Sequence, residues 1–156
     1  MSTLLVASYM VLFACTSMYF GTGWSLVLFS FPTADQLTPE NYYSHFVPQV
    51  EAATRFFTYM TNLMIILAIV MIVGEWGEPL MWVPWVVLAG IVAATILTIV
   101  AILPLNRRMK EGITDSAELG SILKRWMSLN RARVAIWTVQ WLALAVWFVS
   151  FATEGR

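Results

Sequence analysis

Four polar side chains recur at helical spacing within an apolar segment, where their chemistry would operate inside a membrane. Glu51, Arg55, Thr58 and Asn62 follow one another at intervals of four, three and four, so in a helix they share one face. At 1.5 Å per residue this stripe extends about 16 Å from Glu51, which brings Asn62 toward the middle of a bilayer. Ionisable groups there cost roughly 2.5 to 3.5 kcal/mol each on insertion scales, so we expect them to face protein or water.

Two interpretations of the stripe stay open. In the structural one, Glu51 and Arg55 form an i, i+4 ion pair, and Thr58 and Asn62 hydrogen-bond to neighbouring helices. In the functional one, the stripe lines a pocket. His45, the only histidine, precedes Glu51 by six residues, and an imidazole can exchange a proton near neutral pH. His45 therefore lies beside Glu51 at the mouth of the predicted pocket.

A second set of candidates lies where two other apolar runs end and begin. Asn106 follows the third run, and Trp126, Asn130 and Arg133 open the fourth at helical spacing, with Trp137 one turn further in. Amides, a guanidinium and indoles on one face can bind a planar ligand through its oxygens and rings. With Arg55 and Asn62, these five residues form the predicted substrate-binding set.

The composition requires a membrane. Of the 156 residues, 60% are hydrophobic and 12% charged, with eight Trp, which is too apolar for a soluble domain. Four apolar runs are long enough to cross a hydrocarbon core of about 30 Å. They cover residues 4–31, 50–73, 81–103 and 129–152, and Pro32 and Pro104 are expected to end the first and the third. We therefore predict one transmembrane domain over residues 1–156, an all-α four-helix bundle.

The basic residues predict how the bundle is oriented. Seven of the nine Lys and Arg lie between residues 104 and 133, so loops 104–128 and 32–49 are expected in the cytoplasm and both termini outside. A bacterial inner membrane is the expected location. Thr38 before Pro39, and Asp115 before an amphipathic run, predict a short interfacial helix in each cytoplasmic loop, the first ending before Pro48.

Other features of the sequence bear on helix packing and on which cofactors and partners are expected. Ser17, Gly21 and Ser25 form a small-xxx-small pattern that predicts close helix packing. The single Cys15 excludes an internal disulfide, and one His with no Glu-x-x-His disfavours a di-iron site. No cofactor or metal is predicted, although a haem or a single ion at His45 stays open. The basic residues lie against anionic lipid, so we expect no nucleic acid.

Several short motifs resemble one family. A glycine-containing first span ends in Phe29-Ser30-Phe31-Pro32, the third span is followed by Pro104-Leu105-Asn106, and Trp126-x-x-x-Asn130-x-x-Arg133 opens the fourth. Together with four spans, these motifs resemble the anthrone-oxygenase-like family of integral membrane proteins. The resemblance implies oxidation of an anthrone to an anthraquinone by dioxygen without an added cofactor, as in fungal relatives.

That chemistry requires a base, a site for an oxyanion and a dry aromatic pocket. His45 or Glu51 would remove the methylene proton. Arg55, Arg133, Asn106 and Asn130 would hold the oxyanion, and Trp126 and Trp137 would stack on the rings.

The sequence leaves open whether the chain is an enzyme. One alternative is a non-catalytic accessory subunit of a larger membrane complex that contacts lipid, quinone or pigment, and another is a small-molecule binder or transporter. Membrane lipid, an apolar small molecule, and a second copy or a membrane-complex partner are the expected partners.

Overall fold

The computed structural model describes residues 3–154, and the regular elements in that part of the chain are all helices. In chain order they are α1 (Thr3–Ser25), the π-helical turn η1 (Leu26–Ser30), the 3₁₀ turn η2 (Phe31–Gln36), α2 (Tyr42–Gly74), α3 (Trp82–Leu97), the π-helical turn η3 (Thr98–Ile102), α4 (Leu103–Lys110) and α5 (Ser116–Glu154). Four continuous stretches are long and apolar enough to cross a membrane: Thr3–Gln36, Tyr42–Gly74, Trp82–Lys110 and Ser116–Thr153. The predicted all-α four-helix membrane bundle is confirmed.

Two helices begin earlier than predicted. α2 starts at Tyr42 and α5 at Ser116, so the interfacial helices expected in the two loops are the first turns of these spans and not separate elements. Pro48 lies exposed inside α2. The prediction that a helix ends before Pro48 is therefore wrong. Proline cannot donate a backbone hydrogen bond, but the helix tolerates this loss because Pro48 lies near the polar end of the bundle, outside the hydrocarbon.

Pro32 and Pro104 also lie within continuous helical stretches that they were expected to end. Each is preceded by a π-helical turn, η1 or η3, in which the residue before the proline donates its N–H to the carbonyl five positions earlier. The wider turn accommodates a ring that has no N–H and would press on the carbonyl four residues back. Both proline positions thus widen their helix without ending it.

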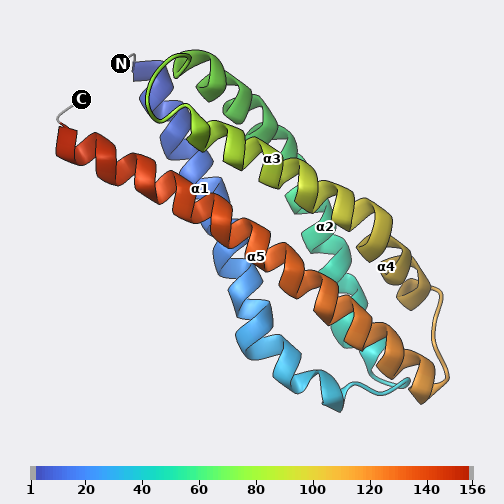
Figure 1. The fold of residues 1–156 in the computed structure, drawn as a ribbon. Coiled ribbons are helices and arrows are strands. Elements are labelled where there is room, and N and C mark those ends of the chain that lie inside the picture. The colour runs from blue at the N-terminus through green and yellow to red at the C-terminus, as the bar shows by residue number, and fades with distance from the viewer. Residues whose placement is uncertain (1–2, 155–156) are drawn as a thin grey trace.

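The four stretches run up and down, with both termini at one end of the bundle (Figure 1). α1 and α3 each pack against both α2 and α5, which places α2 and α5 on the diagonal. The buried apolar residues form two clusters. One centres on Leu12, Met64, Leu144 and Trp147, and the other lies at the far end around Trp126.

Close packing of α1 uses a glycine that the spacing pattern did not select. Gly21 has no atom within 4 Å of a Cβ built on it, whereas a Cβ on Gly23 would lie 2.7 Å from Val134 Cγ2 and 2.9 Å from a ring carbon of Trp137. The small-xxx-small prediction at Gly21 is therefore wrong. Gly23, two residues on, faces α5 and allows the close approach.

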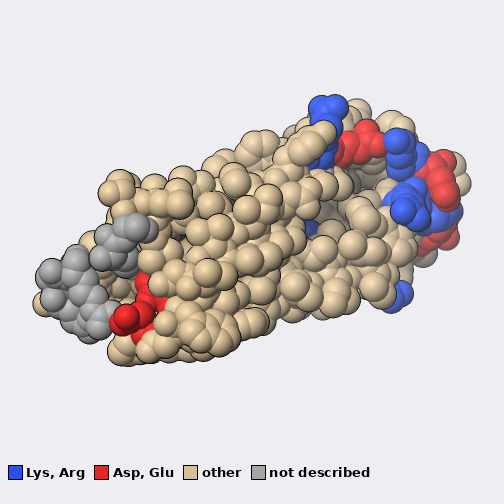
Figure 2. Space-filling model, turned by 90° about the horizontal axis from the view of Figure 1, so that it is seen from above, with Lys and Arg blue, Asp and Glu red and all other residues tan. Residues whose placement is uncertain are grey.

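The charged residues gather at the end away from the termini. At this end Arg108 pairs with Glu118 at 2.7 Å and with Glu111 at 3.6 Å, and Lys110 pairs with Glu51 at 2.6 Å. Figure 2 shows Lys and Arg concentrated at this end, with a hollow in the surface beside them. The loop at this end is held by Tyr42, whose hydroxyl donates to the Met109 carbonyl at 3.0 Å.

Candidate functional site

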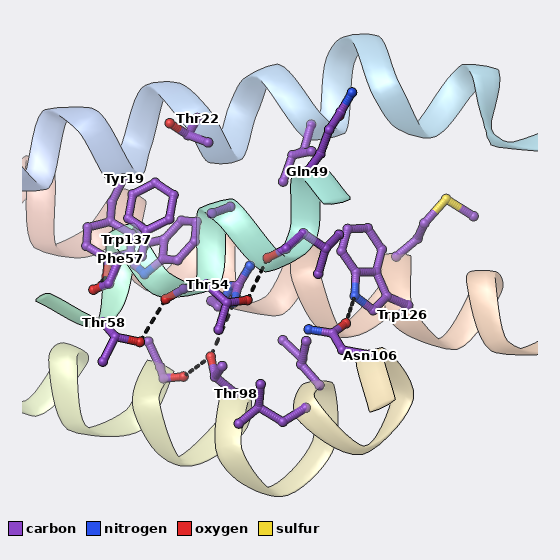
Figure 3. A pocket seen from close by; sticks show the side chains of 18 of the residues that line it. Tyr19, Thr22, Gln49, Thr54, Phe57, Thr58, Thr98, Asn106, Trp126 and Trp137 are labelled. Carbon is purple, nitrogen blue, oxygen red and sulfur yellow. Dashed lines mark hydrogen bonds between the residues drawn. The ribbon is translucent and has the colours of Figure 1, made fainter. Parts of the chain in front are cut away.

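A cavity of about 730 Å³ lies between α1, α2, α3 and α5, next to both π-helical turns. It separates the two core clusters, since Met64 and Trp137 of one and Phe31 and Trp126 of the other line it. Its walls are mainly apolar, and the volume suits a drug-sized ligand. Figure 3 shows side chains from α1, α2, α3 and α5 converging on it.

Arg133 is the cationic group of the cavity. It is largely buried, and its guanidinium donates to Thr98 Oγ1 at 3.3 Å and to Asn130 Oδ1. The carbon at the centre of the guanidinium lies 4.6 Å from the centroid of the Trp137 ring, a cation–π distance. Its Nε is buried without a hydrogen-bond partner.

The partners of Arg133 solvate its charge but do not neutralise it. No ion pair among residues 3–153 includes Arg133. A charge at this depth costs roughly 2.5 to 3.5 kcal/mol on insertion scales. Two hydrogen bonds to a charged group, at about 1.5 to 3 kcal/mol each, offset that cost. The folded protein can therefore hold an unneutralised cation at the cavity wall.

A hydrogen-bonded chain positions this cation. Asn130, fully buried, donates its side-chain amide to the Trp126 carbonyl at 2.8 Å and offers its oxygen to Arg133. The indole of Trp126 donates to Asn106 Oδ1 at 2.8 Å, which links α5 to α4 (Figure 3). The motif Trp126-x-x-x-Asn130-x-x-Arg133 is thus one connected unit that ends on the cation.

Aromatic rings form the wall beneath Arg133. Trp137 lies 4.7 Å from Tyr19 between ring centroids and 6.5 Å from Phe57. The Tyr19 hydroxyl donates to the Phe57 carbonyl at 2.9 Å, which ties α1 to α2 at the deep side of the cavity. A planar ligand that reaches Arg133 would therefore meet flat aromatic surfaces.

Most of the predicted site residues line the cavity. They are His45, Asn62, Asn106, Trp126, Arg133 and Trp137. Asn130 does not line it and acts behind the wall, through Arg133. His45 is exposed near the charged end, whereas Asn62 lies further along α2 toward the middle of the bundle.

Glu51 and Arg55, two members of the predicted polar stripe, do not line the cavity. Glu51 is half-exposed and pairs with Lys110 at the surface, and Arg55 is exposed on the outside of α2. Both lie near the polar end of the helix, where their charges can reach water or headgroups. Glu51 therefore leaves the set of candidate bases, and Arg55 leaves the set of candidate ligand contacts.

Further hydroxyl and amide groups, outside the predicted set of site residues, also line the cavity. They are Tyr19, Thr22, Ser30, Thr33, Gln49, Thr54, Thr61, Thr95, Thr98 and Gln140. The Thr54, Thr58 and Thr98 hydroxyls donate to the carbonyl four residues earlier, so their oxygens can still accept a bond. The spacing of Thr54, Thr58 and Thr61 was a helical signal that could have revealed this face.

Guanidinium, imidazole, amide and hydroxyl groups are thus the polar chemistry of the cavity. No three His, Cys, Asp or Glu side chains gather within the part of the chain that the structure describes. These groups can bind and polarise oxygen atoms of an organic molecule.

The fold and the cavity define the class: an integral membrane helical bundle with an internal cavity of ligand size. Comparison of the chain with protein-family models, curated proteins and solved structures gave no match.

Proposed function

We propose that the protein binds a planar, mainly apolar molecule in the cavity, with an electron-rich oxygen of the ligand on Arg133. The observation that carries this proposal is a guanidinium without a counter-ion that faces an apolar, aromatic-walled cavity inside a membrane bundle. Such a cation attracts a ligand oxygen strongly because little water competes for it.

The reaction we propose is the oxidation of an anthrone-like substrate by dioxygen. His45 takes a proton from the methylene carbon, and the resulting anion places its oxygen on Arg133. The anion carbon reduces and binds dioxygen, and the resulting peroxide takes the proton back from His45 to give a hydroperoxide, which loses water to leave a carbonyl. One dioxygen is consumed, and anthraquinone and one water are produced. The site then has to supply only a base, an oxyanion site and aromatic walls.

Oxygen uptake by the purified protein with anthrone tests the reaction. We expect uptake and anthraquinone absorbance above the rate of empty nanodiscs, with His45→Gln and Arg133→Gln each lowering the excess at least about tenfold. Glu51→Gln is the matched control and should leave the rate unchanged, because Glu51 pairs with Lys110 away from the cavity. Uptake no faster than in empty nanodiscs would contradict the proposed reaction.

A non-catalytic accessory subunit of a membrane complex would use the same cavity for a quinone or pigment. It predicts tight ligand binding without oxygen uptake, together with copurifying partner chains. We infer the orientation of the protein in the membrane from its basic residues, which place the end that holds His45 in the cytoplasm.

A further inference from the structure

Arg133 carries more N–H donors than its protein partners use. A guanidinium carries five N–H groups, and two neutral oxygens, on Thr98 and Asn130, accept from Arg133. The Nε–H is buried, and no group in the described part of the chain accepts from it. Because protein covers Nε, an acceptor supplied from the cavity would meet the two terminal N–H groups of Arg133 that the bonds to Thr98 and Asn130 leave unused.

The charge balance indicates what kind of acceptor it is. Glu51, Glu111 and Glu118 pair with Arg108 and Lys110 at the charged end and not with Arg133. The buried Glu75 lies just beyond α2 at the opposite end, against Trp147 Nε1 at 3.3 Å. A neutral carbonyl on the guanidinium would leave its positive charge unbalanced, whereas an anionic oxygen would accept a hydrogen bond and balance the charge.

The shape of the site selects the class of anion. Trp137 covers one side of the guanidinium and continues into the rings of Tyr19 and Phe57. Such a wall fits an oxygen attached directly to a flat ring system, which can contact the cation and the indole together.

We propose that the ligand binds as an anion, a phenolate or enolate of a fused aromatic ring system, whose ionised oxygen accepts from the guanidinium of Arg133 at the cavity wall and balances its charge. This inference rests on the proposed function and extends it, because ionisation occurs on binding and before any oxidation. A phenol loses its O–H proton and a ketone loses the C–H proton that His45 takes in the proposed reaction. The proton then leaves to water at the charged end, where His45 and Gln49 line the cavity.

A stable phenol tests the inference without turnover. The probe is 2-hydroxyanthraquinone, whose ionised form absorbs at longer wavelength, titrated with pH in nanodiscs while Trp quenching reports its binding. In the wild type we expect the bound probe to ionise about one to three pH units below its midpoint in Arg133→Gln, because an adjacent cation favours the charged form. The methyl ether of the probe, which cannot ionise, should bind at least about tenfold more weakly than the phenol.

Two further variants serve as controls for the charge and the shape of Arg133. Arg131→Gln removes a charge two residues away that lies over Phe31 and does not line the cavity, so it should leave the ionisation unchanged. Arg133→Lys keeps the charge without the planar fork and should retain part of the shift. If the probe binds to the wild type but ionises as it does in Arg133→Gln, the anionic ligand is overturned and the binding proposal stands. If neither the probe nor its ether binds, the proposed function fails and this inference with it.

Discussion

At the scale of single residues, the central feature is that Arg133 is hydrogen-bonded but not neutralised. Asn130 holds it with a neutral oxygen, although a carboxylate of the same size would bind a guanidinium more strongly. A carboxylate there would also cancel the charge that attracts a ligand. The neutral amide of Asn130 therefore positions Arg133 and leaves its charge available to an anion from outside the chain.

Asn130→Asp tests this role directly. The substitution keeps the size of the side chain and turns the acceptor of Arg133 into a counter-ion, so we expect the ionisation shift of bound 2-hydroxyanthraquinone to disappear. Thermal stability in detergent should change little, since the new ion pair offsets the lost hydrogen bond from Asn130 to the Trp126 carbonyl. Asn41→Asp is the control, because Asn41 accepts from the Thr38 N–H in an exposed loop. A full ionisation shift in Asn130→Asp would contradict the role given to Arg133.

The residue types at the site were predictable to a useful extent. Trp126, Asn130 and Arg133 were selected because polar groups at helical spacing inside a span are expected to face one site. In the structure they form one hydrogen-bonded chain. Glu51 and Arg55 were selected by the same spacing but lie outside the cavity. Periodicity fixes which residues share a face, whereas the rotation of that face toward the core depends on the neighbouring helices.

At the scale of helices, close contacts and proline turns position the cavity walls. α1 approaches α5 where Gly23 meets Val134 and Trp137, and η1 and η3 both line the cavity. The sequence predicted that prolines would interrupt these spans. It did not predict π-helical turns, because the choice between ending and widening a helix depends on whether packing continues beyond the proline.

Gly23→Ala and Gly21→Ala form a matched pair on one helix. The first places a methyl group 2.7 Å from Val134 Cγ2, so we expect destabilisation by about 1 to 3 kcal/mol. The second meets open space and should be neutral or stabilise by about 0.5 to 1 kcal/mol, because alanine favours a helix over glycine. Unfolding in mixed micelles followed by circular dichroism compares them. Equal effects in both variants would contradict the assigned contact between α1 and α5.

Pro104→Ala tests whether the π-helical turn shapes the cavity. Pro104 is exposed and does not line the cavity, but alanine restores an N–H that can bond four residues back and regularise η3. We expect stability to be kept or increased and binding of 2-hydroxyanthraquinone to weaken at least about fivefold, because Thr98 and Asn106 on either side of the turn would shift. Pro48→Ala, in a helix without a π-helical turn, should leave binding unchanged. Unaltered binding in both variants would show that η3 does not shape the site.

At the scale of the whole molecule, the charges and the cavity share one end of the bundle. His45 and Gln49 line the cavity near the ion pairs of Arg108 and Lys110, whereas both termini lie at the opposite end (Figure 1). Large apolar side chains such as Phe56, Ile66 and Val100 are more than half exposed, as expected of surfaces that face lipid. In the proposed function, a ligand dissolved in the membrane and protons from water would reach the same site.

Cysteine labelling tests the orientation on which that access depends. In a Cys15→Ser background, Thr114→Cys places a thiol in the basic loop and Trp76→Cys places one in the opposite loop, where the native side chains are exposed. Because basic loops stay in the cytoplasm, a membrane-impermeant maleimide should label position 76 in intact cells and position 114 only after permeabilisation. The Cys15→Ser parent controls for background labelling. The reverse pattern would place His45 and the charged end outside the cell, so the proton released by the ligand would leave to the external medium and not to the cytoplasm.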